Sequence, residues 1–160
     1  MYKIISFLGL IIGIVLAKIF KNELRDIKNF LKILGFILII IIILKLIFLA
    51  DINLMFLIGS VIGILMNYFL KNNYLYFGFI LVLTSFLDDT NKIYFGILIF
   101  IYGLVYSALN NMTKKKIIIM LISFALPFIF LLTNLDLTYN NFIVGFIVGG
   151  LAIGINQFDK

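Results

Sequence analysis

The chain contains no cysteine, no histidine and no tryptophan, and it has a single proline. Without cysteine and histidine it has no disulfides, no thiolate or imidazole ligands for zinc or haem, and no common proton shuttle at neutral pH. We therefore expect no cofactor. Charged residues are also scarce, at 12%, whereas 64% of the residues are hydrophobic. A soluble domain of this size would lack the polar residues to cover its surface, so the sequence predicts a membrane protein.

Seven apolar runs with short connections fill almost the whole sequence. They cover residues 4–20, 33–49, 52–70, 74–87, 93–109, 117–132 and 142–155. A helix needs about 20 residues, and at least about 17, to cross a hydrocarbon core of about 30 Å. Most runs are near that lower limit, the fourth and seventh are shorter, and Pro127 should kink or interrupt the sixth. We expect an all-α fold: one integral membrane domain over residues 1–160, a bundle of about seven short transmembrane helices.

Basic residues gather in every second connection. Lysine and arginine in short loops are retained on the cytoplasmic side of a membrane, whereas acidic residues have little effect. Ten of the thirteen basic residues follow the first, third, fifth and seventh runs: Lys18, Lys21, Arg25, Lys28, Lys32, Lys71, Lys114, Lys115, Lys116 and Lys160. The opposite side carries Asp51, Asp88, Asp89 and Asp136. This pattern places the N-terminus outside and the C-terminus inside, with the cell membrane as the expected location. It also explains the net charge of +6 without nucleic-acid binding.

The stretch between the first two runs, residues 21–32, is amphipathic. Leu24, Ile27 and Leu31 share one side of a helix. A row of basic residues on a neighbouring side follows the same helical spacing: Lys21, Arg25, Lys28 and Lys32. Such a helix can lie in the membrane interface with its charges on anionic lipid headgroups. The simpler interpretation is a topological anchor that is continuous with the second run.

Ten of the twelve glycines lie in the odd-numbered runs, which all cross from outside to inside in this topology. They are Gly9, Gly13, Gly59, Gly63, Gly96, Gly103, Gly145, Gly149, Gly150 and Gly154. Four pairs have the spacing i, i+4, where random placement predicts about one. Small residues at this spacing let helix backbones approach closely. We expect these glycines to pack helices together and the odd-numbered runs to form the inner layer of the bundle.

Two of the runs resemble each other in sequence. Residues 9–22 read GLIIGIVLAKIFKN and residues 59–72 read GSVIGILMNYFLKN, and the two align without a gap. The fifth run aligns less well, with Gly103 in the place of Gly63, and the seventh repeats only the glycine pair. A hairpin repeat of about 40 to 50 residues is one interpretation. Chance matches in a sequence of low complexity are the other.

Few polar residues fall inside the runs. Asn67 continues the stripe of Gly59 and Gly63, and Ser107 continues that of Gly96 and Gly103. Together Asn67 and Ser107 could line a small polar pocket for a solute near the cytoplasmic side. The alternative is hydrogen bonding between helices, at about 0.6 to 2 kcal/mol per contact.

Asp88 and Asp89 stand next to each other in the connection after the fourth run. Oxygen ligands suit Mg²⁺ or Ca²⁺, so the pair is a candidate for a metal-dependent enzyme site. Neighbouring side chains on a helix point in different directions, however, and no nucleophile and base accompany them. A solvated turn is the better explanation, because Asp, Thr and Asn are common turn residues.

These features favour a protein without enzymatic activity. The leading hypothesis is a membrane subunit or scaffold that assembles through its glycine-rich helix faces, as a homo-oligomer or with partner membrane subunits, among membrane lipids. The alternative is a transporter of a small solute or lipid built from hairpin repeats, because repeat transporters bind their substrates at repeat interfaces. A metal-dependent membrane enzyme with its site at Asp88 and Asp89 comes third.

Overall fold

A computed structural model of the chain describes residues 2–20, 24, 26–110, 113–132 and 141–155. Within these residues it has seven α-helices, two short 3-10 segments and no strand, which confirms the predicted all-α class. The α-helices are α1 (Tyr2–Ile19), α3 (Lys28–Phe48), α4 (Leu54–Leu70), α5 (Asn73–Leu83), α6 (Asp89–Leu109), α7 (Lys114–Ala125) and α8 (Asn141–Gly154). The 3-10 segments are η1 (Thr84–Phe86) and η2 (Leu126–Leu132). Each of the seven apolar runs overlaps one α-helix.

Length separates two of these helices from the others. α3 and α6 have 21 residues each and are apolar enough to cross a membrane. The other apolar helices are shorter, down to 14 residues in α8 and 11 in α5. Length and composition therefore identify two membrane-capable helices among the described residues, and the full count of seven spans stays a prediction.

Two helices end in 3-10 turns. Pro127 lies in η2, directly after α7 ends at Ala125. Its ring and its missing N–H prevent regular α-helical bonding, which accounts for the change of helix type in the sixth run. α5 changes in the same way at Thr84, whose hydroxyl donates to the carbonyl of Leu81 at 3.2 Å. Both changes shorten the regular α-helices of the fourth and sixth runs.

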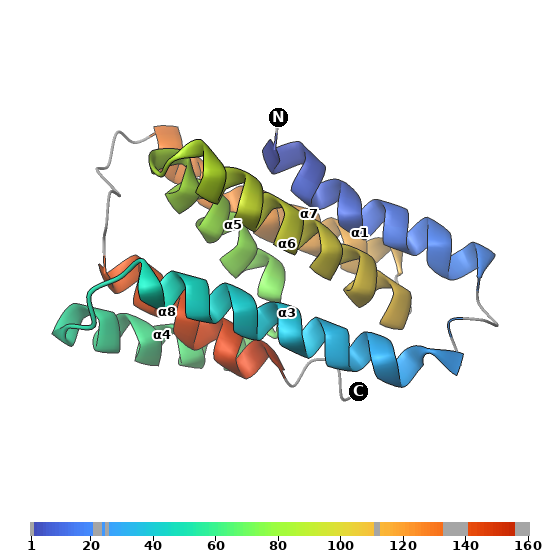
Figure 1. The fold of residues 1–160 in the computed structure, drawn as a ribbon, viewed down its shortest axis with the longest axis horizontal. Coiled ribbons are helices and arrows are strands. Elements are labelled where there is room, and N and C mark those ends of the chain that lie inside the picture. Colours follow the sequence, from blue (N-terminus) through green and yellow to red (C-terminus); the bar gives the residue numbers. More distant parts are fainter. Residues whose placement is uncertain (1, 21–23, 25, 111–112, 133–140, 156–160) are drawn as a thin grey trace.

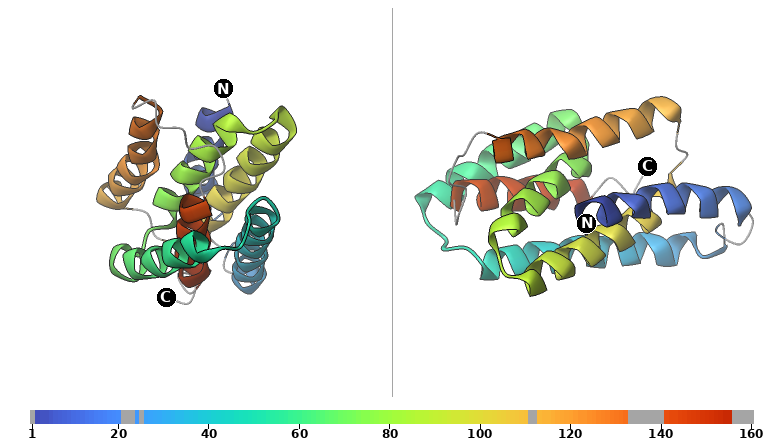
Figure 2. Two further views of the ribbon diagram at one scale, coloured as in Figure 1. Left: turned by 90° about the vertical axis from the view of Figure 1, so that its left-hand side faces the viewer. Right: turned by 90° about the horizontal axis from the view of Figure 1, so that it is seen from above.

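The helices form two close pairs with a central helix between them. α1 packs along α6, and α4 packs along α8. In both pairs the two helices run in the same direction (Figure 1 and Figure 2). α5 lies between the pairs and contacts α6, α7 and α8, while α3 contacts α6 and α8. All four paired helices come from odd-numbered runs.

α5 is the most enclosed helix. Its sequence, NYLYFGFILVL, is mostly apolar on every side, which is typical of a helix that is buried all round. All its residues are buried except Phe79, which is half-buried. We expected the odd-numbered runs to form the inner layer, but the innermost helix comes from the fourth run. The reason is that α4, which comes from the third run, buries only one stripe of residues. The stripe consists of Phe56, Gly59, Gly63 and Asn67.

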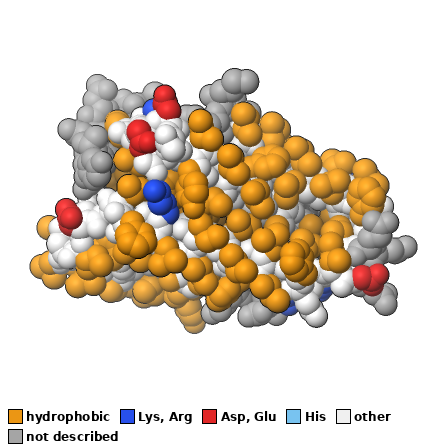
Figure 3. Space-filling model, viewed as in Figure 1, with side chains coloured by type: hydrophobic (Ala, Val, Ile, Leu, Met, Phe, Trp, Pro, Cys, Tyr) orange, Lys and Arg blue, Asp and Glu red, His pale blue; other side chains and the backbone are white. Residues whose placement is uncertain are grey.

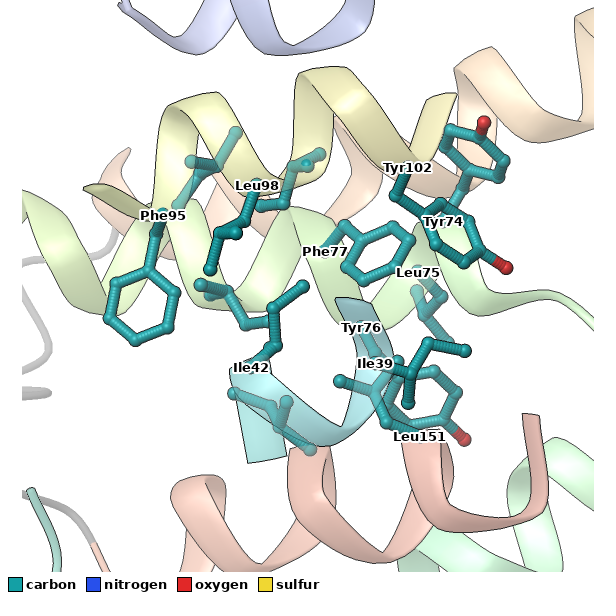
Figure 4. Packing of buried hydrophobic residues seen from close by; sticks show 14 of the residues in the cluster. Ile39, Ile42, Tyr74, Leu75, Tyr76, Phe77, Phe95, Leu98, Tyr102 and Leu151 are labelled. Atoms are coloured by element: carbon teal, nitrogen blue, oxygen red, sulfur yellow. The ribbon is translucent and has the colours of Figure 1, made fainter. Parts of the chain in front are cut away.

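The hydrophobic core surrounds α5 (Figure 4). Phe77 packs edge-on against Tyr102 of α6, with ring centroids 4.7 Å apart. From another side of α5, Tyr76 reaches toward α8, where its ring lies 5.2 Å from that of Phe146. Ile39 of α3 is fully buried in the same cluster. Side chains from three other helices thus close around α5.

The outer faces of the helices are apolar. On α4 the side chains of Val61, Leu65 and Phe69 are 57%, 53% and 78% exposed. Figure 3 shows hydrophobic side chains over most of one face of the molecule, with few charged groups among them. Several polar side chains lie inside instead: Asn67 and Asn73 are 0% and 1% exposed. This distribution is the reverse of that in a typical soluble protein.

Candidate functional site

Glycines bring α4 and α8 into backbone contact. Two glycines from each helix face carbonyl oxygens of the other helix so closely that a Cβ would overlap them. The contacts are Gly59 with Phe142, Gly63 with Phe146, Gly145 with Phe56, and Gly149 with Ser60. Such close approach permits weak Cα–H to carbonyl contacts of about 0.5 to 1 kcal/mol each. We call this reciprocal contact the α4–α8 seam.

The α1–α6 seam is built in a similar way, with one polar side chain in it. Its contacts are Gly9 with the backbone of Phe100, Gly103 with the backbone of Gly9 and Leu10, and Gly13 with the backbone of Leu104 and the hydroxyl of Ser107. The Ser107 hydroxyl donates within its own helix, to the carbonyls of Gly103 at 2.7 Å and Leu104 at 3.1 Å. Ser107 therefore lies in this seam as a packing residue whose hydrogen bond is satisfied locally.

The two seams correspond in the contacts of their first glycine pairs. The first glycine pair of α1 aligns in sequence with that of α4, and each pair faces carbonyl groups with the same spacing on its partner helix. The corresponding contacts are Gly9 to Phe100 and Gly59 to Phe142, and then Gly13 to Leu104 and Gly63 to Phe146. Aligned sequence positions thus make matching contacts, which favours the repeat interpretation over chance similarity.

Between α4 and α5 the chain turns within two residues. Lys71 has a left-handed backbone conformation, with φ 49°, and its N–H donates to the carbonyl of Asn67 at 2.8 Å. A left-handed residue is a common way to end a helix. The side chain of Asn72 then accepts the N–H of Tyr74 at 3.0 Å and so caps the start of α5.

Asn67 ties this turn to α8. Its amide nitrogen donates to the carbonyl of Gly150 at 2.5 Å and to the side-chain oxygen of Asn73 at 3.0 Å. Its side-chain oxygen accepts the N–H of Asn72 at 3.0 Å. The buried amide therefore has partners for both its donor and its acceptor atoms, as burial of such a group requires.

Asn73 and Asn72 extend the connection to three further places. The amide nitrogen of Asn73 donates to the hydroxyl of Tyr102 on α6 at 2.9 Å and to the carbonyl of Gly154 at the end of α8 at 3.2 Å. The amide nitrogen of Asn72 donates to the hydroxyl of Ser123 on α7 at 2.8 Å. We call the three asparagines and these partners the inner junction, because they join α4, α5, α6, α7 and α8.

The inner junction lies well inside the ends of α6 and α7. Ser123 is nine residues from the start of α7 at Lys114, or about 13 Å at about 1.5 Å per residue. Tyr102 is seven residues, or about 10 Å, from the end of α6 at Leu109. Figure 1 accordingly shows α8 ending before α6 and α1 do. One end of each of the two helices α5 and α8, which come from the fourth and seventh runs, lies at this junction.

The groups at the inner junction are neutral amides, hydroxyls and backbone carbonyls. They can donate and accept hydrogen bonds, but they do not exchange protons readily near neutral pH. Among the described residues no three histidine, cysteine or acidic side chains come together as metal ligands. The chemistry available there is recognition by hydrogen bonding.

The two residues predicted to line a pocket lie in different places. Asn67 belongs to the inner junction, whereas Ser107 lies in the α1–α6 seam against Gly13. The bonds of the Asn67 side chain run to α5 and α8, and those of Ser107 stay within α6. Gly96 is buried in α6, outside both groups.

Asp88 and Asp89 lie at the start of α6, on the exposed surface. The amide of Asn91 donates to the carboxylate of Asp88, and this hydrogen bond lowers the pKa of the carboxyl below its usual value. Asp89 forms an ion pair with Lys92 at 2.8 Å. Each carboxylate therefore has a neighbour on its own helix turn, which is how a solvated turn is stabilised.

The predicted lipid-headgroup residues fall partly within the described chain. Lys28 and Lys32 lie in the first turns of α3, in continuity with the helix of the second run. Lys21, Arg25 and the acidic Asp136 lie outside the described residues.

The sequence hypothesis for the site omitted Asn72, Asn73, Tyr74 and Tyr102. A signal for the first two was present in the sequence: three asparagines occur within seven positions around Lys71, between two apolar runs. Polar side chains so close to apolar segments have to find partners inside the protein. The partner on α6, Tyr102, is 29 positions from Asn73 and has no local signal.

We found no match for this chain among protein-family models, curated protein sequences or solved structures. The inner junction and the two seams are therefore the basis on which function is inferred.

Proposed function

We propose that the chain is an integral membrane protein whose seven short helices all cross or enter the bilayer. The support is the distribution of side chains, with apolar residues such as Leu65 and Phe69 outside and amides such as Asn67 and Asn73 inside. Lipid is an apolar solvent, so a bilayer suits this arrangement. The basic residues that follow the odd-numbered runs would place the N-terminus outside and the inner junction on the cytoplasmic side, near anionic lipid headgroups.

Within the membrane, we infer that the protein transports a small solute and has no enzymatic activity. The observation that carries this inference is the inner junction, where the ends of α4, α5 and α8 meet about 10 Å inside their neighbours. Non-helical backbone at membrane depth is tolerated where it is buried in protein or lines a water-filled space. Transporters place such interrupted helices at the interface between structural repeats, and the matching glycine contacts of the two seams support such an arrangement here.

Transport is tested by the swelling of proteoliposomes. The purified chain is reconstituted, and the vesicles are mixed in a stopped-flow instrument with an iso-osmotic gradient of urea or glycerol. The protein should raise the swelling rate several-fold over protein-free vesicles, and Asn73→Leu should remove the increase. The matched control is Asn110→Leu, because within the described residues the Asn110 side chain bonds to the Tyr106 carbonyl of its own helix, at 2.9 Å. Swelling at the protein-free rate with both solutes would contradict the proposal.

A membrane scaffold or subunit is the second candidate. The glycines first assigned to assembly are in contact within the chain, so a partner would meet another surface. α4 offers one, because α8 is its main contact and the side chains of Val61, Leu65 and Phe69 are exposed. A stoichiometric foreign protein in the particle extracted in mild detergent or a native nanodisc would support the scaffold. A homogeneous particle of this chain alone would leave transport as the better explanation.

A further inference from the structure

We propose that the inner junction leads to a binding site for a small neutral molecule, and that the hydroxyl of Tyr74 is the group that binds it. This inference rests on the transport function proposed above and names its class of substrate: a molecule without charge that carries a hydrogen-bonding group. Tyr74 is the second residue of α5, next to the junction residue Asn73.

The Tyr74 hydroxyl lacks a partner in the described part of the chain. Tyr74 is 2% exposed, and its oxygen is enclosed without a hydrogen bond. The neighbouring phenols differ: Tyr76 donates to the carbonyl of Gly63 at 3.0 Å, and Tyr102 accepts from Asn73 at 2.9 Å. A buried hydroxyl without a hydrogen-bond partner has lost its bonds to water and gained none in return. A ligand that bonds to it removes this desolvation penalty, which favours binding.

Aromatic rings from three helices surround this hydroxyl-bearing ring. The ring centroid of Tyr74 lies 5.8 Å from Phe77, 5.9 Å from Tyr106, 6.3 Å from Tyr102 and 6.4 Å from Phe7. Figure 4 shows Tyr74, Phe77 and Tyr102 together at one end of the core. Such walls suit a ligand with a small apolar body and one polar group.

The surroundings select a neutral ligand. The fully buried polar side chains among the described residues are Ser6, Asn67, Asn73, Thr84 and Ser107, all of them neutral. An ion that left water for this place would lose its hydration without gaining a counter-charge, which is strongly unfavourable. A neutral amide or alcohol gives up its hydrogen bonds to water and forms hydrogen bonds of the same kind with the protein.

The site lies where α5 faces the α1–α6 pair. Phe7, Tyr102 and Tyr106 belong to the α1–α6 pair, whereas Asn73 connects Tyr74 to the end of α8 through Gly154. The α4–α5 turn begins at Lys71, which is exposed and lies three positions before Tyr74 in the chain. A solute would therefore enter beside Lys71 and pass Asn73 to reach Tyr74.

The experiment uses cysteine labelling, because the natural chain has no cysteine and gives no background. Tyr74→Cys and Phe77→Cys are prepared separately, reconstituted in proteoliposomes, and treated with methyl methanethiosulfonate, a small neutral thiol reagent. Intact mass spectrometry follows the adduct. The two variants are matched, because each shortens a buried aromatic residue of α5 by a similar amount. Cysteine at position 74 should react at least about tenfold faster, since reaction at position 77 requires local opening of the core.

A second variant keeps the test valid if the cysteine changes perturb the fold. Tyr74→Phe removes only the hydroxyl, so it should fold with an unchanged or higher melting temperature and should reduce urea-driven swelling several-fold. Tyr68→Phe on the exposed face of α4 is the control for this change. Equal labelling at positions 74 and 77 would overturn the site. If the wild type swells faster than protein-free vesicles, swelling of Tyr74→Phe at the wild-type rate would also overturn it.

The experiments distinguish an error in the assignment of the binding site from an error in the proposed transport function. If wild-type vesicles do not swell but position 74 is labelled rapidly, the site stands and transport is wrong. If wild-type vesicles swell and Tyr74→Phe swells equally, transport stands and the assignment of Tyr74 is wrong.

Discussion

The α4–α8 seam and the α1–α6 seam use the same glycine spacing but place different groups opposite the glycines. In α4–α8, Gly59 and Gly63 face only backbone atoms of the partner helix. In α1–α6, Gly13 also faces the hydroxyl of Ser107, where the corresponding residue of α8 is Gly149. The comparison teaches that backbone contact is common to both pairs, whereas the α1–α6 pair contains one side chain that can adjust.

The largest effect is expected where the seam consists of backbone alone. Gly63→Leu would put a side chain into the carbonyl of Phe146 and the N–H of Gly150, which cannot move without separating the helices. We expect a loss of about 3 kcal/mol or more, seen as poor yield or a much lower melting temperature. Val61→Leu, on the exposed face of the same helix, should change stability by less than about 0.5 kcal/mol. Normal melting of Gly63→Leu would contradict the seam.

The inner junction should be the next most sensitive place. Asn67→Ala removes the bonds to Gly150, Asn73 and the N–H of Asn72, and leaves those groups without their partner. The expected loss is about 1 to 3 kcal/mol in the free energy of unfolding. Asn110→Ala is the control because, among the described residues, the Asn110 side chain bonds to its own helix. Equal melting temperatures for the two variants would show that the junction contributes little to stability.

A smaller and reversible effect is expected in the α1–α6 seam. Gly13→Ala meets Ser107 first, so it should cost about 1 kcal/mol less than Gly63→Ala in the other seam. Adding Ser107→Gly to Gly13→Ala makes the seam more like that of α4 and α8, and should restore part of the melting temperature. A double variant that is less stable than Gly13→Ala alone would refute the correspondence of the seams.

The smallest effect is expected at the surface turn before α6. Asp89→Asn removes an ion pair with Lys92 whose carboxylate is 89% exposed. Exposed pairs of this kind contribute about 0 to 1 kcal/mol, and less at high salt. In 0.5 M salt the stability should change by roughly 0.5 kcal/mol or less, which corresponds to about one or two degrees in the melting temperature. A large stabilisation of the wild type by added Mg²⁺ that is lost in Asp89→Asn would instead support a metal site.

Much of the fold follows from the hydrophobic pattern. Each apolar run overlaps a helix because a stretch without polar side chains can satisfy its backbone groups only within itself when it is removed from water. The i, i+4 glycines pointed to close helix contact for a similar reason. The glycine pattern did not predict which helices pair with each other. The partners, α1 with α6 and α4 with α8, are far apart in the sequence, and one glycine stripe can pack against any other stripe of similar shape.

The inner position of α5 also did not follow from the glycine pattern. α5 is buried because its surface is apolar on every side. In the sequence, this apolar character predicts a membrane span but does not show that the span lies at the centre of the bundle. The site was predicted in part: Asn67 was recognised by its place in an apolar run. By the sequence pattern, Asn73 lies in a connection between two runs and Tyr74 lies at the start of the fourth run. Nothing in the local sequence shows that this connection lies between other helices.

The most direct test of the membrane bundle is sided labelling of the two ends of α4, a helix that is shorter than α3 and α6. Asp51→Cys and Lys71→Cys, each the only cysteine in its chain, are expressed in cells and treated with a membrane-impermeant maleimide before and after permeabilisation. Both positions are exposed and α4 lies between them. The account predicts that cysteine 51 reacts in intact cells and that cysteine 71 reacts only after permeabilisation. Labelling of both from the same side would contradict it, because α4 would then not cross the membrane and the inner junction would not face the cytoplasm.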